Sequence, residues 1–319
     1  LFFAIQFMSH TFQGSLSSKN LYWIFVTIFV GFFAAIGLNN EFLFKRSTPL
    51  FRNQIMHKNQ VQSLVIVILN TIFTFTIASF FNVSTIFAAS LTCVISAFLL
   101  PKFESEAYSG SVAGMIGAYL CSHWSVAILI GLVTGIIFIL FSPYFQGIGG
   151  RSGLIAYIAT MFSIRILLNL TPIQRTPIEQ ELIVPSFFAI VFAALFTFFL
   201  HKSKRSTTIR AAMLICLVSS ILIPVPYYTI TNAIFAGTVV GTSTEERIDS
   251  MSHLVIVTIL CFVLFIPSFH MLDGIGGKLG ILCFLSYQAS IGLKIFLKQM
   301  KYLVHPNRSQ SSIQISNKK

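Results

Sequence analysis

The chain has 319 residues, of which 55% are hydrophobic and 9% are charged, and its mean hydropathy is +0.84. A soluble domain carries about 25% charged residues, so this composition excludes an ordinary soluble protein and predicts residence in a lipid bilayer. The long apolar runs do not alternate with polar residues as the strands of a membrane barrel do, so they predict an all-α polytopic membrane protein.

The formal net charge of +12 indicates topology rather than a nucleic-acid partner. Lys and Arg gather in three groups, at residues 45–58, 202–210 and 294–319, and each group lies between or after apolar segments. Cytoplasmic loops of membrane proteins have this arrangement. We therefore expect a multi-pass protein of the inner (cytoplasmic) membrane with a cytoplasmic C-terminus.

The apolar runs predict about eleven transmembrane segments. In chain order they lie near residues 21–38, 61–80, 84–100, 108–121, 124–144, 149–166, 182–200, 209–223, 228–242, 253–269 and 276–293. The chain begins at Leu1 with apolar residues and without Met. We expect this start to be either a truncation or the end of a helix that begins upstream.

Two glycine motifs each occur twice. Tyr-Ser-Gly-Ser-Val-Ala-Gly at 108–114 returns as Phe-Ala-Gly-Thr-Val-Val-Gly at 235–241, and the Gly-x-Gly-Gly motif at 147–153 returns at 274–280. Both pairs have one offset, since 235 − 108 = 127 and 274 − 147 = 127. A shared register over this length predicts an internal duplication.

The duplication divides the chain into four parts. Residues 1–58 form an N-terminal segment with one transmembrane helix and a basic cytoplasmic loop, 59–170 a first five-helix repeat, 178–296 a second repeat, and 297–319 a basic polar tail. With five crossings in each repeat, all three basic groups fall on one side of the membrane, whereas four crossings would separate them. The positive-inside rule therefore favours two inverted repeats.

The first glycine motif has two interpretations. A small residue at every fourth position lets two membrane helices approach closely, which is a common mode of packing. Alternatively, the motif belongs to a short helix at mid-membrane, whose hydroxyls and exposed backbone line a solute pathway. The pathway residues under this second interpretation are Ser109, Gly110, Ser111, Gly114, Gly237, Thr238, Gly241 and Thr242.

The second motif places a cation, Arg151 or Lys278, after three glycines at the start of an apolar helix. Free backbone N–H groups beside a cation can bind an anion, and paired cations could act as gates. A tight turn with a snorkelling side chain explains the same pattern, and we favour the turn.

The first glycine motif, at 108–114 and again at 235–241, resembles the Phe-Asn-Gly-x-Leu-Val-Gly signature of the urea transporters. That resemblance implies a channel-like pore between inverted repeats. Ser109 and Ala236 stand at the position of the family's Asn, and the chain has no Leu-Pro-x-x-Thr-x-Pro-Phe segment of the family's selectivity slot.

These features favour a transporter or channel for a small polar solute over an enzyme, and we expect no cofactor and no catalytic residues. The alternative is a membrane subunit of an electron-transfer complex, because such subunits have a similar inverted-repeat fold and hold flavin at a Ser-Gly-Ala-Thr-like site, of which Ser109, Gly110 and Ser111 share part. That alternative implies flavin or quinone. The His and Cys residues have no metal-ligand spacing, so we expect no metal. The expected partners are the bilayer and the solute, and a homo-oligomer stays open.

Overall fold

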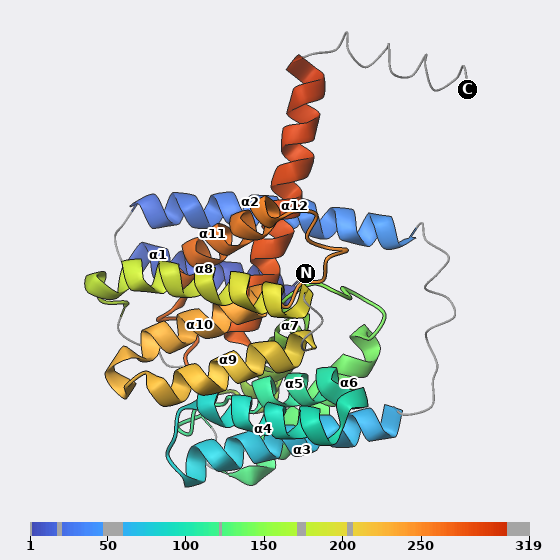
Figure 1. The fold of residues 1–319 in the computed structure, drawn as a ribbon, viewed down its shortest axis with the longest axis vertical. Coiled ribbons are helices and arrows are strands. Elements are labelled where there is room, and N and C mark those ends of the chain that lie inside the picture. The colour runs from blue at the N-terminus through green and yellow to red at the C-terminus, as the bar shows by residue number, and fades with distance from the viewer. Residues whose placement is uncertain are drawn as a thin grey trace.

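The computed structural model describes residues 2–17, 21–46, 60–120, 123–170, 177–202 and 207–304, and its regular elements are helices (Figure 1). The predicted all-α class is therefore confirmed. The described part of the N-terminal region holds α1 (Phe2–Ser17) and α2 (Leu21–Arg46), where the sequence predicted one helix.

In the described residues after α2, ten α-helices follow in two groups of five. The first group is α3 (Gln60–Phe80), α4 (Thr85–Leu99), α5 (Glu104–Ala113), α6 (Trp124–Phe141) and α7 (Arg151–Met161). The second is α8 (Gln180–Lys202), α9 (Thr208–Leu222), α10 (Tyr228–Gly241), α11 (Met251–Ser268) and α12 (Lys278–Val304). Short 3₁₀ turns, Pro101–Phe103 and Val225–Tyr227, precede α5 and α10, and a π-helical segment, Phe162–Leu167, continues α7.

Six helices of the described residues are long and apolar enough to cross a membrane, which is consistent with a membrane-embedded protein. They are α2, α3, α6, α8, α11 and α12, whereas α4 and α9 are shorter apolar helices. This number is smaller than the eleven predicted segments. The apolar windows at 108–121 and 149–166 each join a short helix to a different backbone conformation: α5 ends at Ala113 before a coil, and α7 changes into the π-helical segment.

Local signals in the sequence explain several helix ends. Ser84 and Thr207 accept hydrogen bonds from the backbone N–H groups of Phe87 (3.2 Å) and Arg210 (3.4 Å), and so cap the N-termini of α4 and α9. Both helices end before a proline, Pro101 or Pro224, which disfavours helical geometry in the preceding residue.

The helices form a body through which α12 passes at a steep angle. In Figure 1, α8, α10, α9, α4 and α3 lie in a row, each packed against the next, and α2 covers α12 at the upper edge. The first half of α12 is buried around its whole circumference, because Ile281, Leu282, Cys283, Phe284 and Leu285 are each at most 1% exposed. A helix that is apolar on all sides is stable only inside a protein or a membrane. The start of α12 therefore occupies the core.

The outward faces of the row carry large apolar side chains. Phe73 on α3 is 56% exposed and Phe192 on α8 is 66% exposed. Large apolar side chains that are exposed along several neighbouring helices are unusual on a water-soluble monomer and suit contact with lipid.

Candidate functional site at the junction of the glycine loops

The glycines of the first motif lie in tight helix crossings. A Cβ atom on Gly114, which caps the end of α5, would lie 2.6 Å from the carbonyl oxygen of Thr71 on α3, and one on Gly241 of α10 would lie 2.5 Å from the carbonyl oxygen of Ala194 on α8. Gly110 and Gly237 meet the same two partner helices one turn earlier. This arrangement agrees with the packing interpretation of the motif.

The hydroxyl groups of the motif bond to their own helices. Ser109 Oγ donates to Ser105 O (2.9 Å) and Ser111 Oγ to Tyr108 O (3.1 Å). In α10, Thr238 Oγ1 donates to Phe235 O (2.8 Å) and Thr242 Oγ1 to Val239 O (2.6 Å). Such bonds satisfy a hydroxyl donor inside a helix without an external ligand. Ser109, Ser111 and Thr238 are 0% exposed.

The loops that follow the helices connect the two halves of the chain. The Thr244 N–H donates to the carbonyl of Gly147 (2.9 Å), and the Gly117 N–H donates to the carbonyl of Gly274 (3.1 Å). The donors and the acceptors are each separated by 127 residues, since 244 − 117 = 127 and 274 − 147 = 127. Gly147 and Gly274 have φ angles of +76° and +71°, which glycine adopts without steric cost.

The second motif also brings the chain against its own copy. The N-terminal turns of α7 and α12 cross at Gly153 and Gly280, where a Cβ on either glycine would collide with the Cα of the other. Gly149 packs on the last turn of α10, and Gly276 packs on the last turn of α5. The helices α5 and α10 are therefore linked through the glycine loops that precede α12 and α7.

The two cations of the second motif cap helix ends. Arg151 Nε donates to Tyr144 O (2.8 Å) and Nη2 to Phe141 O (3.1 Å), at the end of α6. Lys278 Nζ donates to Phe269 O (2.8 Å) and Met271 O (3.0 Å), just after α11. Positive charge at the carbonyl end of a helix is favourable. These contacts fit the turn interpretation that the sequence favoured.

A small pocket with polar lining lies where these elements meet. Its volume is about 100 Å³. The apolar part of its wall includes Val112, Met115 and Phe235, and the polar part includes Thr85, Tyr119, Asn232, Asp273 and Lys278. Tyr119 OH donates to Asp273 Oδ2 (3.0 Å) and so joins the loop after α5 to the loop before α12. A water takes up about 30 Å³ in the liquid, so the pocket has room for a few waters or one small solute.

Sequence reasoning placed the pathway on the motif residues and missed part of this wall. The wall residues Asp273, Tyr119 and Thr85 lie outside the predicted pathway residues. The available signal was their position, because Asp273 immediately precedes Gly274 and Tyr119 follows Gly117 by two residues. Among the proposed site residues, Lys278 lines the pocket, while Gly114 lies directly before its wall residue Met115.

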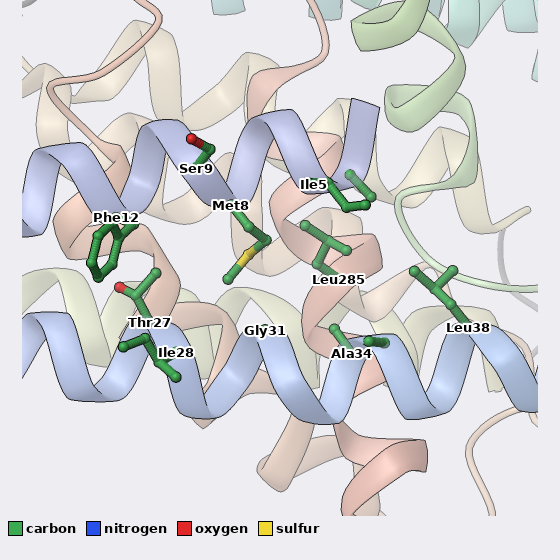
Figure 2. A pocket seen from close by; sticks show the side chains of 12 residues that line it. Ile5, Met8, Ser9, Phe12, Thr27, Ile28, Gly31, Ala34, Leu38 and Leu285 are labelled. Carbon is green, nitrogen blue, oxygen red and sulfur yellow. The ribbon is translucent and has the colours of Figure 1, made fainter. Parts of the chain in front are cut away.

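A larger cavity of about 320 Å³ has the opposite character. Figure 2 shows it between α1 and α2, where Ile5 and Met8 face Ile28 and Leu38, with Leu285 of α12 behind. Among its lining residues Ser9 and Thr27 carry hydroxyls, and the others are apolar or glycine. This cavity is suited to hydrocarbon rather than to a polar solute.

Ion pairs connect helices and loops that are far apart in the sequence. Glu104 at the start of α5 pairs with Arg210 at the start of α9. Arg247 in the loop after α10 binds Glu41 of α2 in a bidentate manner, with both N–O distances 3.1 Å. Lys294 of α12 binds Asp249 (2.6 Å), and this hydrogen bond lowers the pKa of Asp249.

Within the part of the chain that the structure describes, no group of three or more His, Cys, Asp and Glu side chains could hold a metal ion. Comparison with protein-family models, with curated proteins and with solved structures gave no match. The function is therefore inferred from the geometry of this junction.

Proposed function

We propose that the protein is a membrane transporter or channel for a small polar solute, with its pathway between two inverted five-helix repeats. The observation that carries this proposal is the polar pocket of about 100 Å³, because loops and helix ends from both halves of the chain build it. Thr85, Asn232 and Asp273 would replace part of the hydrogen bonding that the solute loses when it leaves water.

Matched contacts support the two repeats. Val67 on α3 lies against Gly110, and Ile190 on α8 lies against Gly237, with 190 − 67 = 123. The loop bonds and the contact between Gly153 and Gly280 recur at an offset of 127. The offset changes from 123 to 127 because the second half has four more residues between the proline after α9 and the glycine motif of α10 than the first half has between the proline after α4 and the glycine motif of α5.

The ion pairs support the inverted arrangement. Glu104 and Arg210 can pair only if the start of α5 and the start of α9 lie at the same side, which five crossings in each repeat produce. In this topology the chain crosses the bilayer from the start of α5 to the loop that follows it, and Tyr119 and Asp273 lie at the outer side. The pocket is then an outer vestibule, lined by Gly277 and Lys278 at the start of α12.

Cysteine labelling tests the topology. We expect an impermeant maleimide to label Tyr227→Cys in intact cells and Lys102→Cys only after the membrane is disrupted, because Tyr227 precedes α10 and Lys102 precedes α5. Both variants carry Cys121→Ser. Four crossings in each repeat would place both positions at the same side, so equal labelling contradicts the inverted repeats.

Transport is tested in proteoliposomes by stopped-flow light scattering, which reports the entry of any uncharged solute without a label. Urea, formamide and glycerol form the first panel. We expect at least one of them to permeate faster than through protein-free vesicles. We also expect Asn232→Leu to lower that permeability about tenfold, since a lost hydrogen bond in a buried site costs about 1–3 kcal/mol.

Glu245→Gln is the matched control for transport, because Glu245 is exposed in the loop after α10 and lies outside the pocket wall. Its permeability should equal that of the wild type. If Asn232→Leu and Glu245→Gln behave alike, the pocket is not on the pathway. A visible absorption band of flavin in the purified protein, or a quinone in its solvent extract, together with no permeation, would instead favour the flavin- or quinone-binding subunit.

A further inference from the structure

The end of α12 differs in its surroundings from the rest of that helix. Residues 281–290 are buried, whereas residues 296–301 are exposed. In Figure 1 this last part of α12 projects beyond α2, clear of the other described helices. In that view α12 runs across α2, against which it packs, and its last part extends past α2.

The projecting segment, residues 294–301, has two chemically distinct rows. Lys294, Lys298 and Lys301 follow one another at spacings of four and three residues, so they share one face of the helix. A second row at the same spacings includes Leu297 and Met300, which are 58% and 43% exposed. A helix with lysines on one side and exposed apolar residues on another is typical of the membrane interface.

Contacts with the body fix how this segment is turned. Lys294 binds Asp249 in the loop before α11 (2.6 Å), and the ring of Phe296 lies 5.5 Å from that of Phe33 on α2. Both contacts hold the first turn of the segment. Its remaining lysines, Lys298 and Lys301, are consequently carried outward on the same face as Lys294.

We propose that residues 294–301 lie on the cytoplasmic surface of the bilayer and bind anionic lipid headgroups through Lys298 and Lys301. Water as the only neighbour would leave Leu297 and Met300 exposed at a cost, and hydrocarbon would bury unpaired lysines. The interface satisfies both rows at once. The negative charge of phospholipid headgroups complements the lysine row, and each lysine near such a surface strengthens binding about fivefold.

A fluorescent reporter on the apolar row tests this proposal. An environment-sensitive nitrobenzoxadiazole dye is attached to Leu297→Cys in a Cys121→Ser background, since the other four cysteines are buried. The full chain is placed in nanodiscs of phosphatidylcholine, with or without about one third phosphatidylglycerol. We expect blue-shifted emission that doxyl-labelled lipid quenches, and quenching that increases when phosphatidylglycerol is present.

The lysines are then tested directly. Phosphatidylglycerol should raise the apparent affinity of the segment for lipid, and Lys298→Gln combined with Lys301→Gln should lower this affinity about 25-fold. The control is Lys102→Gln, which changes an exposed lysine elsewhere at the same side and should leave the affinity unchanged. Emission typical of water in both nanodiscs would overturn the proposal. Quenching that changes neither with phosphatidylglycerol nor with the lysine substitutions would also overturn it. Cross-linking through Leu297→Cys would then identify contact with a second copy.

Discussion

Gly153→Ala is expected to destabilise the protein by about 3 kcal/mol, the upper part of the range for overpacking. The added methyl group would collide with the Cα of Gly280, so the clash is with backbone and no side-chain rotation relieves it. The N-terminal turns of α7 and α12 would have to separate, and the loops that join the two halves would move with them. Gly280→Ala should have a similar effect, because the same contact is lost from the other side.

A thiol-reactive dye measures this change, because Cys93, Cys216, Cys261 and Cys283 are buried and react when the protein unfolds. Gly135→Ala on α6 is the matched control. A Cβ at that position first meets the end of the Leu64 side chain, which can rotate away. We expect Gly135→Ala to melt close to the wild type. Equal melting of Gly153→Ala and Gly135→Ala would show that the contact between α7 and α12 is not formed.

The sequence was sufficient to predict the helical class and most helix positions. Apolar runs of membrane length carry a strong signal, and Pro101 and Pro224 mark the ends of α4 and α9. The windows at 108–121 and 149–166 were less informative, since hydropathy does not distinguish an apolar helix from the apolar coil or π-helical segment that follows it. For the same reason, hydropathy gave no warning that Ala113 ends α5.

The repeated glycines located the junction, yet their partners could not be predicted. Gly153 meets Gly280 and Gly117 meets Gly274 across more than a hundred residues, and nothing local in the sequence specifies such pairs. The same limit applies to Tyr119 and Asp273, which are 154 residues apart. The hydroxyl groups of the motif were predicted to line a pathway because they are polar in an apolar segment. Their own helix backbones satisfy them, as for Ser109.

Breaking the ion pair between Arg247 and Glu41 is the second change from which we expect a large loss of stability. Glu41 is 8% exposed, and Arg247 binds both of its carboxylate oxygens at 3.1 Å. Arg247 Nε also donates to Gln146 O (3.0 Å), so one side chain joins α2 to loops of both halves. Arg247→Ala would remove both of these hydrogen bonds from the nearly buried Glu41 carboxylate. We expect a loss of about 3 kcal/mol, at the lower end of values for breaking a buried pair.

The exposed pair of Asp249 with Lys294 provides the control, because Asp249→Asn should cost less than about 1 kcal/mol. A double-mutant cycle with Glu41→Gln and Arg247→Gln then isolates the coupling between the two side chains. The double variant should be more stable than the sum of the single losses predicts. Additive losses would mean that α2 does not dock on the loop after α10. Because Glu41 lies just before the basic residues 45–58, a measured coupling would also place that loop at the same membrane face as this basic group.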